Sequence, residues 1–316
     1  MIDKFNFYDI YGYFLPGLAL LGVLWLPYGI VQSAWPSSNW GSTIIAVVLA
    51  YLVGHLMLYV TTSVIPSNDV KKSSEKDRYP SVTVLDPDSS DLSAELRKKI
   101  GEAVTAQFKL NLGIDVGDGK TDTGDGKYDK VRNDAFLLAR QMLIQEKAAT
   151  YAEQFQGMYS LTRGLLAALA IGTVYFAGWA ISALRVDRSS DVAVALVFLA
   201  MAVAVNLGCI RLRGIDGPNV TPEQRKLLRQ RKLTRERAYA ASLLALFCFS
   251  GYLLGLGHEM QARQWAMLVA AGVVSLLGCL LCQRQYRSFA VRFATTVWLS
   301  FVCMQLKEKS SDTAVE

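Results

Sequence analysis

Residues 164–184 read GLLAALAIGTVYFAGWAISAL, and this stretch decides the class of protein. It contains no charged side chain, while Arg163 and Arg185 stand directly at its two ends. An α-helix rises about 1.5 Å per residue, so about 20 apolar residues are needed to cross a hydrocarbon core about 30 Å thick. The strands of a membrane barrel would place a polar residue at every second position, which this stretch does not do. It therefore predicts a transmembrane α-helix.

The same pattern recurs along the chain of 316 residues and predicts about six transmembrane helices. The fold class that we expect is an all-α membrane protein, with a mainly helical cytoplasmic insert between the second and third transmembrane helices. The expected transmembrane helices cover residues 10–31, 43–65, 164–184, 192–210, 238–256 and 265–282.

The distribution of lysine and arginine orients these helices. The chain carries 33 Lys and Arg against 27 Asp and Glu, a net charge of +6. In a membrane protein such an excess gathers in cytoplasmic segments close to helix ends. Basic residues flank the insert, and a second basic segment covers residues 211–237. We therefore expect the N-terminus, the insert and the C-terminus in the cytoplasm, and no specific nucleic-acid binding.

This topology divides the chain into four segments. They are a transmembrane hairpin at residues 1–66, the insert at 67–160, a four-helix transmembrane region at 161–282 and a C-terminal tail at 283–316.

The insert is expected to be mainly helical. Residues 83–88 indicate a short extended piece and a turn, before a helix that starts near Asp91 or Ser93, because both side chains can accept hydrogen bonds from free N–H groups. Residues 113–130 are rich in Gly and Asp and predict a loop. From Asn133 onward no helix-breaking residue occurs, so we expect one continuous helix into the third transmembrane helix.

The tail predicts an amphipathic cytoplasmic helix. Its apolar stripe lies beside arginines, which is typical of a helix at a membrane surface or in an oligomer contact. A seventh transmembrane helix is the alternative. However, Arg292 interrupts the apolar run, and a seventh helix would place Lys307 and Lys309 outside the cell.

No motif predicts an enzyme, a metal site or a cofactor. The sequence GIDVGDGKT at residues 113–121 resembles a phosphate-binding loop, but that loop needs four residues between its first Gly and the Gly-Lys pair, and five separate Gly113 from Gly119. The aspartates there lack the spacing and closing Glu of a calcium loop. Cys279 and Cys282 share a helix face, yet zinc needs two further ligands that the sequence does not offer nearby.

Two polar residues inside the expected transmembrane helices are candidates for functional contacts. His55 lies in the second helix and Asn206 near the cytoplasmic end of the fourth. A hydrogen bond to a neighbouring helix is one interpretation, and for His55 a pore or proton role is the other. His258 falls in a turn on the opposite side of the membrane from the cytoplasm, so this topology excludes a joint site of the two histidines.

Small residues recur at four-residue spacing in the third and fifth expected helices. This spacing lets helices approach closely, within a protomer or between protomers. The residues are Gly164, Ala168, Gly172, Gly251 and Gly255.

The second basic segment is a candidate surface for an anionic ligand or for lipid headgroups. Orientation of the transmembrane helices is the alternative explanation for the same charges. The residues concerned are Arg225, Lys226, Arg229, Arg231, Lys232, Arg235 and Arg237.

Several stretches resemble a known group of proteins. They are PGLALLG at residues 16–22, YPSVTVLDPD at 79–88, DAFLLARQML at 134–143 and AEQFQGMYSLTRGL at 152–165. Together they look like multi-pass bacterial inner-membrane proteins of antiphage defence loci, and among these the channel-forming effectors of the Hailong defence system. That resemblance implies the bacterial inner membrane, an oligomeric ion channel, and gating by a nucleotide signal from a partner nucleotidyltransferase. It rests on general patterns, so no functional residue is carried over.

Three functions follow as hypotheses. The resemblance implies a channel or membrane-disrupting effector of antiphage defence, controlled by a cytoplasmic signal. A small-solute transporter would need a polar cavity between repeated halves, and the sequence shows no such repeat. A non-conducting membrane scaffold would use the insert to dock a soluble partner. The paired catalytic groups that an enzyme needs are missing.

Overall fold

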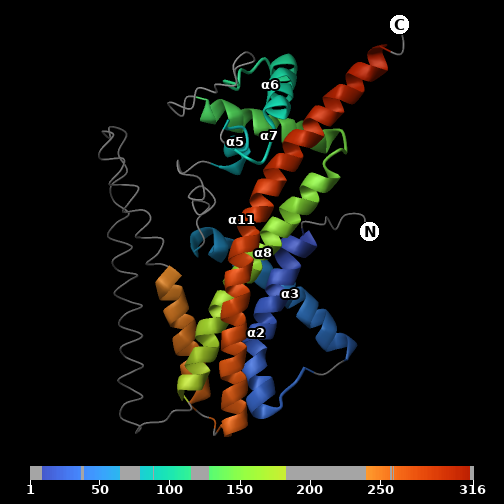
Figure 1. Cartoon of the computed structure of the whole chain (residues 1–316). Helices are drawn as coiled ribbons and strands as arrows, with labels where there is room; N and C mark the ends of the chain where they lie inside the picture. Colours follow the sequence, from blue (N-terminus) through green and yellow to red (C-terminus); the bar gives the residue numbers. More distant parts are fainter. Residues whose placement is uncertain are drawn as a thin grey trace, which may run out of the picture. The chain divides into compact units, whose positions relative to one another are not determined.

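The computed structural model describes residues 9–36, 39–64, 79–87, 89–114, 128–182, 240–256, 258 and 260–313. Within these residues the regular elements are helices, and no strand occurs (Figure 1). The chain divides into two compact units. The insert–tail unit comprises Met1–Asp9, Ser67–Ser160 and Arg284–Glu316, and the span unit comprises Ile10–Pro66 and Leu161–Gln283.

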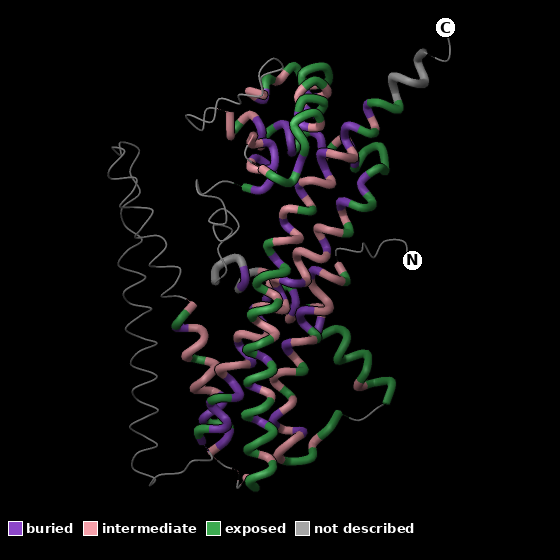
Figure 2. The backbone as a smooth tube through the Cα atoms, in the orientation of Figure 1, coloured by how far each residue is buried: buried purple, intermediate pink, exposed green. Residues whose placement is uncertain are grey.

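The span unit begins with a helical hairpin. The π-helix η2 (Ile10–Phe14) leads into α2 (Leu15–Gln32), and α3 (Trp40–Val64) returns. Pro16 lies in the first turn of α2, where the missing N–H of proline costs least. At the far end of α2 the indole Nε1 of Trp25 donates to the Ala34 carbonyl at 2.7 Å. Much of α3 is exposed within this unit (Figure 2).

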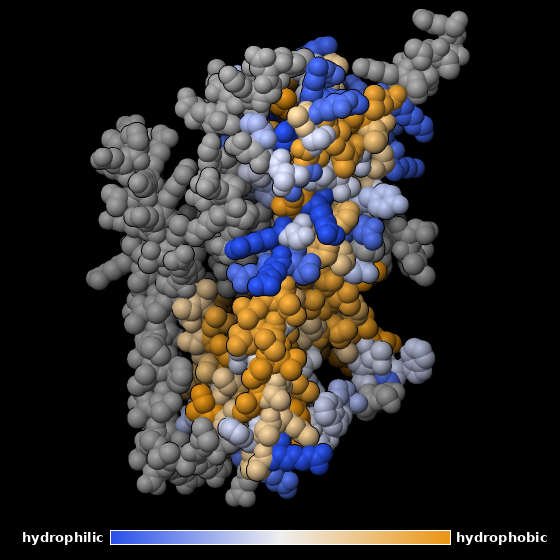
Figure 3. All heavy atoms as spheres, in the orientation of Figure 1, coloured by the Kyte–Doolittle hydropathy of each residue, from blue (hydrophilic) through white to orange (hydrophobic). Residues whose placement is uncertain are grey.

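Four helices of the described residues are long and apolar enough to cross a membrane, which makes the chain a helical membrane protein by length and composition. They lie at Ile10–Gln32, Trp40–Leu58, Thr150–Ser182 and Ala262–Lys307, and a shorter apolar helix covers Ala240–Gly255. The second of them is part of α3, the third is α8 (Thr150–Ser182), and the fourth lies in α11 (Ala262–Thr313). The surface of α11 in the span unit is strongly hydrophobic (Figure 3). The expected transmembrane helix at residues 192–210 lies outside the described residues.

The expected close approach of helices at small residues is confirmed within the protomer. At several glycines an atom of a neighbouring helix lies within 3.0 Å of the place that a Cβ atom would take, so the helices approach closely there. The pairs are Gly164 with Pro16, Gly172 with Val23, Gly251 with Tyr175 and Gly255 with Ser182.

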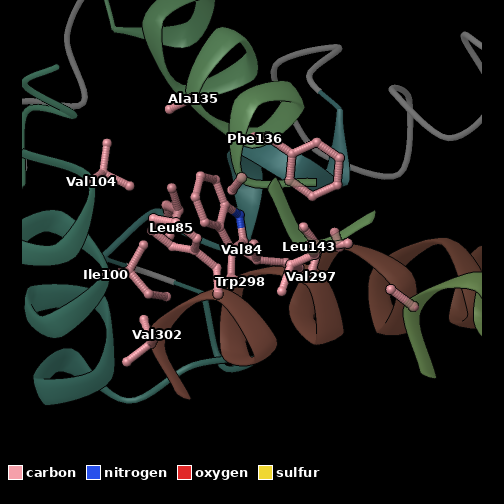
Figure 4. Close-up of a cluster of buried hydrophobic side chains, with 14 of the residues drawn as sticks. Val84, Leu85, Ile100, Val104, Ala135, Phe136, Leu143, Val297, Trp298 and Val302 are labelled. Carbon is pink, nitrogen blue, oxygen red and sulfur yellow. The ribbon is translucent and has the colours of Figure 1, made fainter. Parts of the chain in front are cut away.

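The insert–tail unit packs three short helices against the C-terminal half of α11. These helices are α5 (Pro80–Thr83), α6 (Ala94–Phe108) and α7 (Asp129–Gln145). Trp298 of α11 lies fully buried among Val84, Leu85 and Phe136, as Figure 4 shows. Its indole meets the Phe136 ring at 5.6 Å between centroids, and its Nε1 donates to the Ser81 carbonyl at 3.1 Å.

The tail differs from the expected surface helix. It is helical, but α11 runs unbroken through 52 residues, and the apolar stripe of the tail forms part of the insert–tail core. Val297, Trp298 and Phe301 are fully buried there. A stripe seen in the sequence shows that a helix face needs cover, whereas only the tertiary structure shows that the insert supplies it.

The expected extended piece at the start of the insert is wrong. Tyr79 has extended geometry, but Pro80 begins the short helix α5 and turns follow it. Proline is favourable at the first helical position because its φ angle is already helical. The burial of Val84 and Leu85 in the core that they share with α11 then stabilises this compact path.

The expected start of the next helix is confirmed. Ser93 is the N-cap of α6, and its Oγ accepts a hydrogen bond from the Leu96 N–H at 3.3 Å. This bond satisfies one of the free N–H groups of the first turn.

Replacing Ser93 with alanine is expected to destabilise α6 by about 1 kcal/mol, because the first turn loses its acceptor. Hydrogen–deuterium exchange of the full-length protein should show faster exchange in the first turn of α6. Ser93→Asp keeps an acceptor and should exchange like the wild type. Equal exchange in Ser93→Ala and the wild type would contradict the capping role.

The expected continuous helix from Asn133 into the third transmembrane helix is also wrong. α7 starts at Asp129, inside the expected loop at residues 113–130, and ends at Gln145, while α8 begins at Thr150. Lys147 between them has the left-handed φ of 54°, and the Ala148 N–H donates to the Leu143 carbonyl at 2.9 Å. This is a common way to end a helix, normally with glycine at the left-handed position. Because the residue at this position is a lysine and not a glycine, the sequence does not indicate that the helix ends between α7 and α8.

Candidate functional site

His55 is the sequence-predicted site residue that the structure describes. It lies on α3 inside the candidate span Trp40–Leu58, and its side chain is exposed. The other candidates fall in residues 183–239, outside the described residues, so their roles stay predictions. They are Asn206, Arg225, Lys226, Arg229, Arg231, Lys232, Arg235 and Arg237.

The imidazole of His55 belongs to a cluster of three rings, which we name the His55 cluster: His55, Tyr13 and Tyr51. The ring stacks on Tyr13 with centroids 4.1 Å apart and planes at 26°. It meets Tyr51 edge to face at 4.6 Å and 83°. The two tyrosine rings lie 6.3 Å apart. The position of the imidazole is therefore fixed from two sides by aromatic contacts.

Two glycines bring the members of the His55 cluster together. Tyr51 and His55 share a face of α3 because they are four residues apart. Tyr13 reaches them from η2, and a Cβ atom at Gly54 would overlap the Tyr13 carbonyl oxygen. A Cβ atom at Gly17 would likewise overlap the Ala50 carbonyl oxygen. The backbones of the hairpin can approach this closely only because both positions lack a side chain.

The imidazole of His55 has stacking partners but no hydrogen bond to any group in the described parts of the chain. A histidine ring carries one donor and one acceptor in its neutral form. Inside a membrane span such groups are costly unless a partner or water satisfies them. Within these residues, the hydrogen bond to a neighbouring helix that the sequence suggested is therefore not made.

The second histidine lies elsewhere in the span unit. The Nε2 atom of His258 is 2.8 Å from the Nε2 atom of Gln32, and its ring stacks on Trp179 at 5.8 Å. Gln32 is the last residue of α2, whereas the His55 cluster contacts η2 just before the start of α2. The two histidines thus lie near opposite ends of α2 and share no site.

The buried arginines of the insert–tail unit serve its structure. Arg132 is almost fully buried, pairs with the Asp86 carboxylate at 2.8 Å and donates from Nε to the Leu112 carbonyl at 2.9 Å. Arg97 donates to three loop carbonyls, those of Pro87, Ser89 and Leu92. Both guanidinium groups hold loops onto helices, and such bonds to charged donors are among the stronger ones in proteins.

Metal-binding geometry is not found in the part of the chain that the structure describes, since no three His, Cys, Asp or Glu side chains come together there. Cys279 and Cys282 are half-buried free cysteines on α11. They stand on the side of α11 that carries Leu268 and Ser275, which are buried.

No protein-family model, curated protein or solved structure matches this chain.

Tyr13 belongs to the His55 cluster, although no pattern in the sequence singled it out. The aromatic run YGYF at residues 11–14, directly before Pro16, is the signal that could have directed attention to this segment. What it could not give is the π-helical geometry of η2, which accompanies the contact of Tyr13 with His55.

Proposed function

We propose that this chain is an oligomeric channel or membrane-disrupting effector of bacterial antiphage defence, controlled by a signal received in the cytoplasm. The resemblance in its sequence is one support. The other, which carries the proposal, is that α8 and α11 each contribute residues to both units. Residues 150–160 of α8 and 284–313 of α11 belong to the insert–tail unit, and the remainder of each helix belongs to the span unit.

Helices that contribute residues to both units can transmit a conformational change from the insert–tail unit to the span unit. A helix is a stiff element because each turn is hydrogen-bonded to the next. Trp298 and its neighbours fix α11 in the core of the insert–tail unit between Val291 and Met304. A ligand that favours one arrangement of this core over another shifts the population of both arrangements. The two shared helices are the direct covalent route by which that shift can reach the span unit.

The topology that we propose has six transmembrane helices in the bacterial inner membrane. The fourth is placed at residues 192–210, and Ala240–Gly255 forms most of the fifth. The N-terminus, the insert, residues 211–237 and the C-terminus are placed in the cytoplasm by the positive-inside rule. The basic side chains from Arg225 to Arg237 would then face the inner-leaflet headgroups or an anionic signal such as a nucleotide made by a partner enzyme.

Reconstitution tests the conducting function. Full-length protein in liposomes loaded with potassium should release the ion, and release should increase when nucleoside triphosphates or short linear and cyclic oligonucleotides are added on the side of the insert. The wild-type protein should also depolarise bacterial cells when it is expressed together with the nucleotide that increases ion release from liposomes. A potential-sensitive dye reports this depolarisation. Liposomes that stay sealed under every condition, together with cells that keep their potential, would favour the non-conducting scaffold instead.

A further inference from the structure

Five of the six tryptophans of this chain belong to the span unit, and all five lie toward one end of it. This is the end at which α2 and α8 finish and at which α3 and α11 begin, and we name it the tryptophan end. The five residues are Trp25, Trp35, Trp40, Trp179 and Trp265.

Side-chain hydrogen bonds hold the helices together at the tryptophan end. Gln264 donates from Nε2 to the carbonyls of Ile30 and Val31 at 3.3 and 3.2 Å. Trp265 donates from Nε1 to the carbonyl of Ala180 at 3.1 Å. The last turn of a helix leaves carbonyl groups without an intrahelical partner. These bonds therefore join the last turns of α2 and α8 to the start of α11.

Four of these tryptophans are exposed in the described residues. Trp25 is 49% exposed, Trp35 60%, Trp40 87% and Trp265 36%. An indole combines a large apolar ring with one N–H donor, and it is enriched where the hydrocarbon of a membrane meets the headgroups. The exposed rings of the tryptophan end have the chemistry of that boundary.

The opposite end of the span unit carries an arginine. Arg163 of α8 donates to the carbonyl of Thr61 in the last turns of α3 at 3.2 Å. At 1.5 Å per residue, Trp40 and Thr61 are about 32 Å apart along α3, and Arg163 and Ala180 are about 26 Å apart along α8. Both lengths are close to the thickness of a hydrocarbon core, about 30 Å. The two ends are therefore spaced like the two boundaries of a bilayer.

The surface of α11 that starts from the tryptophan end is apolar. Every exposed side chain from Met267 to Leu281 is apolar, whereas Arg263 and Gln283 stand just outside this stretch. Figure 3 shows the hydrophobic surface over this part of α11. Acyl chains satisfy such a surface, because it offers no hydrogen-bonding group.

We propose that the tryptophan end binds the phospholipid headgroup region of one leaflet, the leaflet remote from Arg163, and that Trp35 and Trp40 are its lipid contacts. Trp25 and Trp265 donate their N–H groups to backbone carbonyls, whereas the Nε1 atoms of Trp35 and Trp40 make no hydrogen bond to any group in the described residues. These two N–H groups are available to the ester carbonyls and phosphates of phospholipids. The inference depends on the span helices alone and holds whether or not the chain conducts ions.

Fluorescence quenching in liposomes measures the depth of these rings. The full-length protein is reconstituted in phosphatidylcholine that is brominated either close to the headgroup or close to the end of the acyl chain. The contribution of Trp40 is the difference between the wild type and Trp40→Phe, and that of Trp35 is obtained in the same way. We expect the bromines close to the headgroup to quench both contributions more strongly than the deeper bromines do.

A tryptophan placed in the apolar stretch of α11 is the matched control. Val274 is 67% exposed and lies near the middle of that stretch, so the fluorescence added by Val274→Trp should be quenched more strongly by the deeper bromines. The proposal is overturned if Trp35 and Trp40 are quenched by neither lipid, or if the bromines close to the headgroup quench them no more strongly than the deeper ones.

Thermal unfolding separates the lipid contact from contacts within the protein. In a maltoside detergent, which has no ester or phosphate group, Trp40→Phe should unfold within about one degree of the wild type. Trp265→Phe should unfold a few degrees lower, because the Ala180 carbonyl loses its donor. A midpoint for Trp40→Phe as low as that of Trp265→Phe would show that Trp40 has a partner within the protein and would overturn its assignment as a lipid contact.

Discussion

Replacing Trp298 with alanine is expected to unfold the insert–tail unit while leaving the helices of the span unit folded. The side chain is fully buried and touches parts of the insert that are distant in sequence, namely Ser81, Val84 and Phe136. Truncation of a buried Trp costs about 3–5 kcal/mol. It also removes the partner of the Ser81 carbonyl, which costs about 1 kcal/mol more. A loss of this size is a large part of the stability of an ordinary domain, about 5–15 kcal/mol.

Hydrogen–deuterium exchange of the full-length protein measures this effect helix by helix. In Trp298→Ala, the amides of α6 and α7 should lose protection, whereas those of α2 and of residues 164–182 in α8 should keep it. Trp298→Phe should fall between alanine and wild type, because the aromatic ring remains and the hydrogen bond is lost. The control is Leu306→Ala on the same helix, since Leu306 is 54% exposed and its truncation leaves no cavity.

The same variant bears on control of the proposed channel. If the insert–tail unit receives the signal, Trp298→Ala should abolish the response to added nucleotide in liposomes, and Leu306→Ala should respond like the wild type. Protection of α6 and α7 equal to that of the wild type would show that Trp298 is not central to this core. An unchanged nucleotide response from a protein whose α6 and α7 have lost protection would show that the signal is received elsewhere.

The second large effect is expected from Gly17→Ala in the hairpin. The added Cβ atom would overlap the Ala50 carbonyl oxygen and lie 2.7 Å from the Gly54 nitrogen. Both of these are backbone atoms, so no side-chain rotation can relieve the overlap, and α2 must move away from α3. Overpacking of this kind costs about 1–3 kcal/mol, and we expect the upper end of that range because the whole helix must shift.

Gly22 provides a matched control on the same helix. A Cβ atom at Gly22 meets nothing within 4 Å, so Gly22→Ala makes the same chemical change in open space. Thermal unfolding in detergent should give a midpoint several degrees lower for Gly17→Ala than for the wild type, and a midpoint near that of the wild type for Gly22→Ala. Equal midpoints for the two variants would mean that the backbones of α2 and α3 do not meet at Gly17.

Part of the fold could be predicted from the sequence, because several helices are indicated by residues that lie close together in the chain. The charge-free run at residues 164–184 predicts a helix of α8 without knowledge of any partner, and Ser93 predicts the start of α6 through a hydrogen bond that spans three residues. The spacing of Gly251 and Gly255 predicts a close helix contact, although not which helix makes it. In the structure, α8 makes this contact, with Tyr175 against Gly251 and Ser182 against Gly255.

Only one part of the candidate site, His55, could be predicted from the sequence. His55 stands out in the sequence as a polar residue in an apolar run, which is a local feature. Its neighbour Tyr13 does not stand out, because their contact joins η2 to α3 across a turn and depends on the absence of side chains at Gly17 and Gly54. Sequence spacing alone does not show which faces of two helices meet.

The length and charge of an apolar run are local properties, so the amino-acid sequence predicts a helical membrane protein without any knowledge of tertiary contacts. Three features become visible only in the folded chain: α11 completes the core of the insert, a lysine in left-handed geometry separates α7 from α8, and His55 stacks on Tyr13. Each of these depends on contacts between residues far apart in the chain, or on a backbone geometry that such contacts stabilise. A periodic pattern shows that a face must be covered, and the fold selects what covers it.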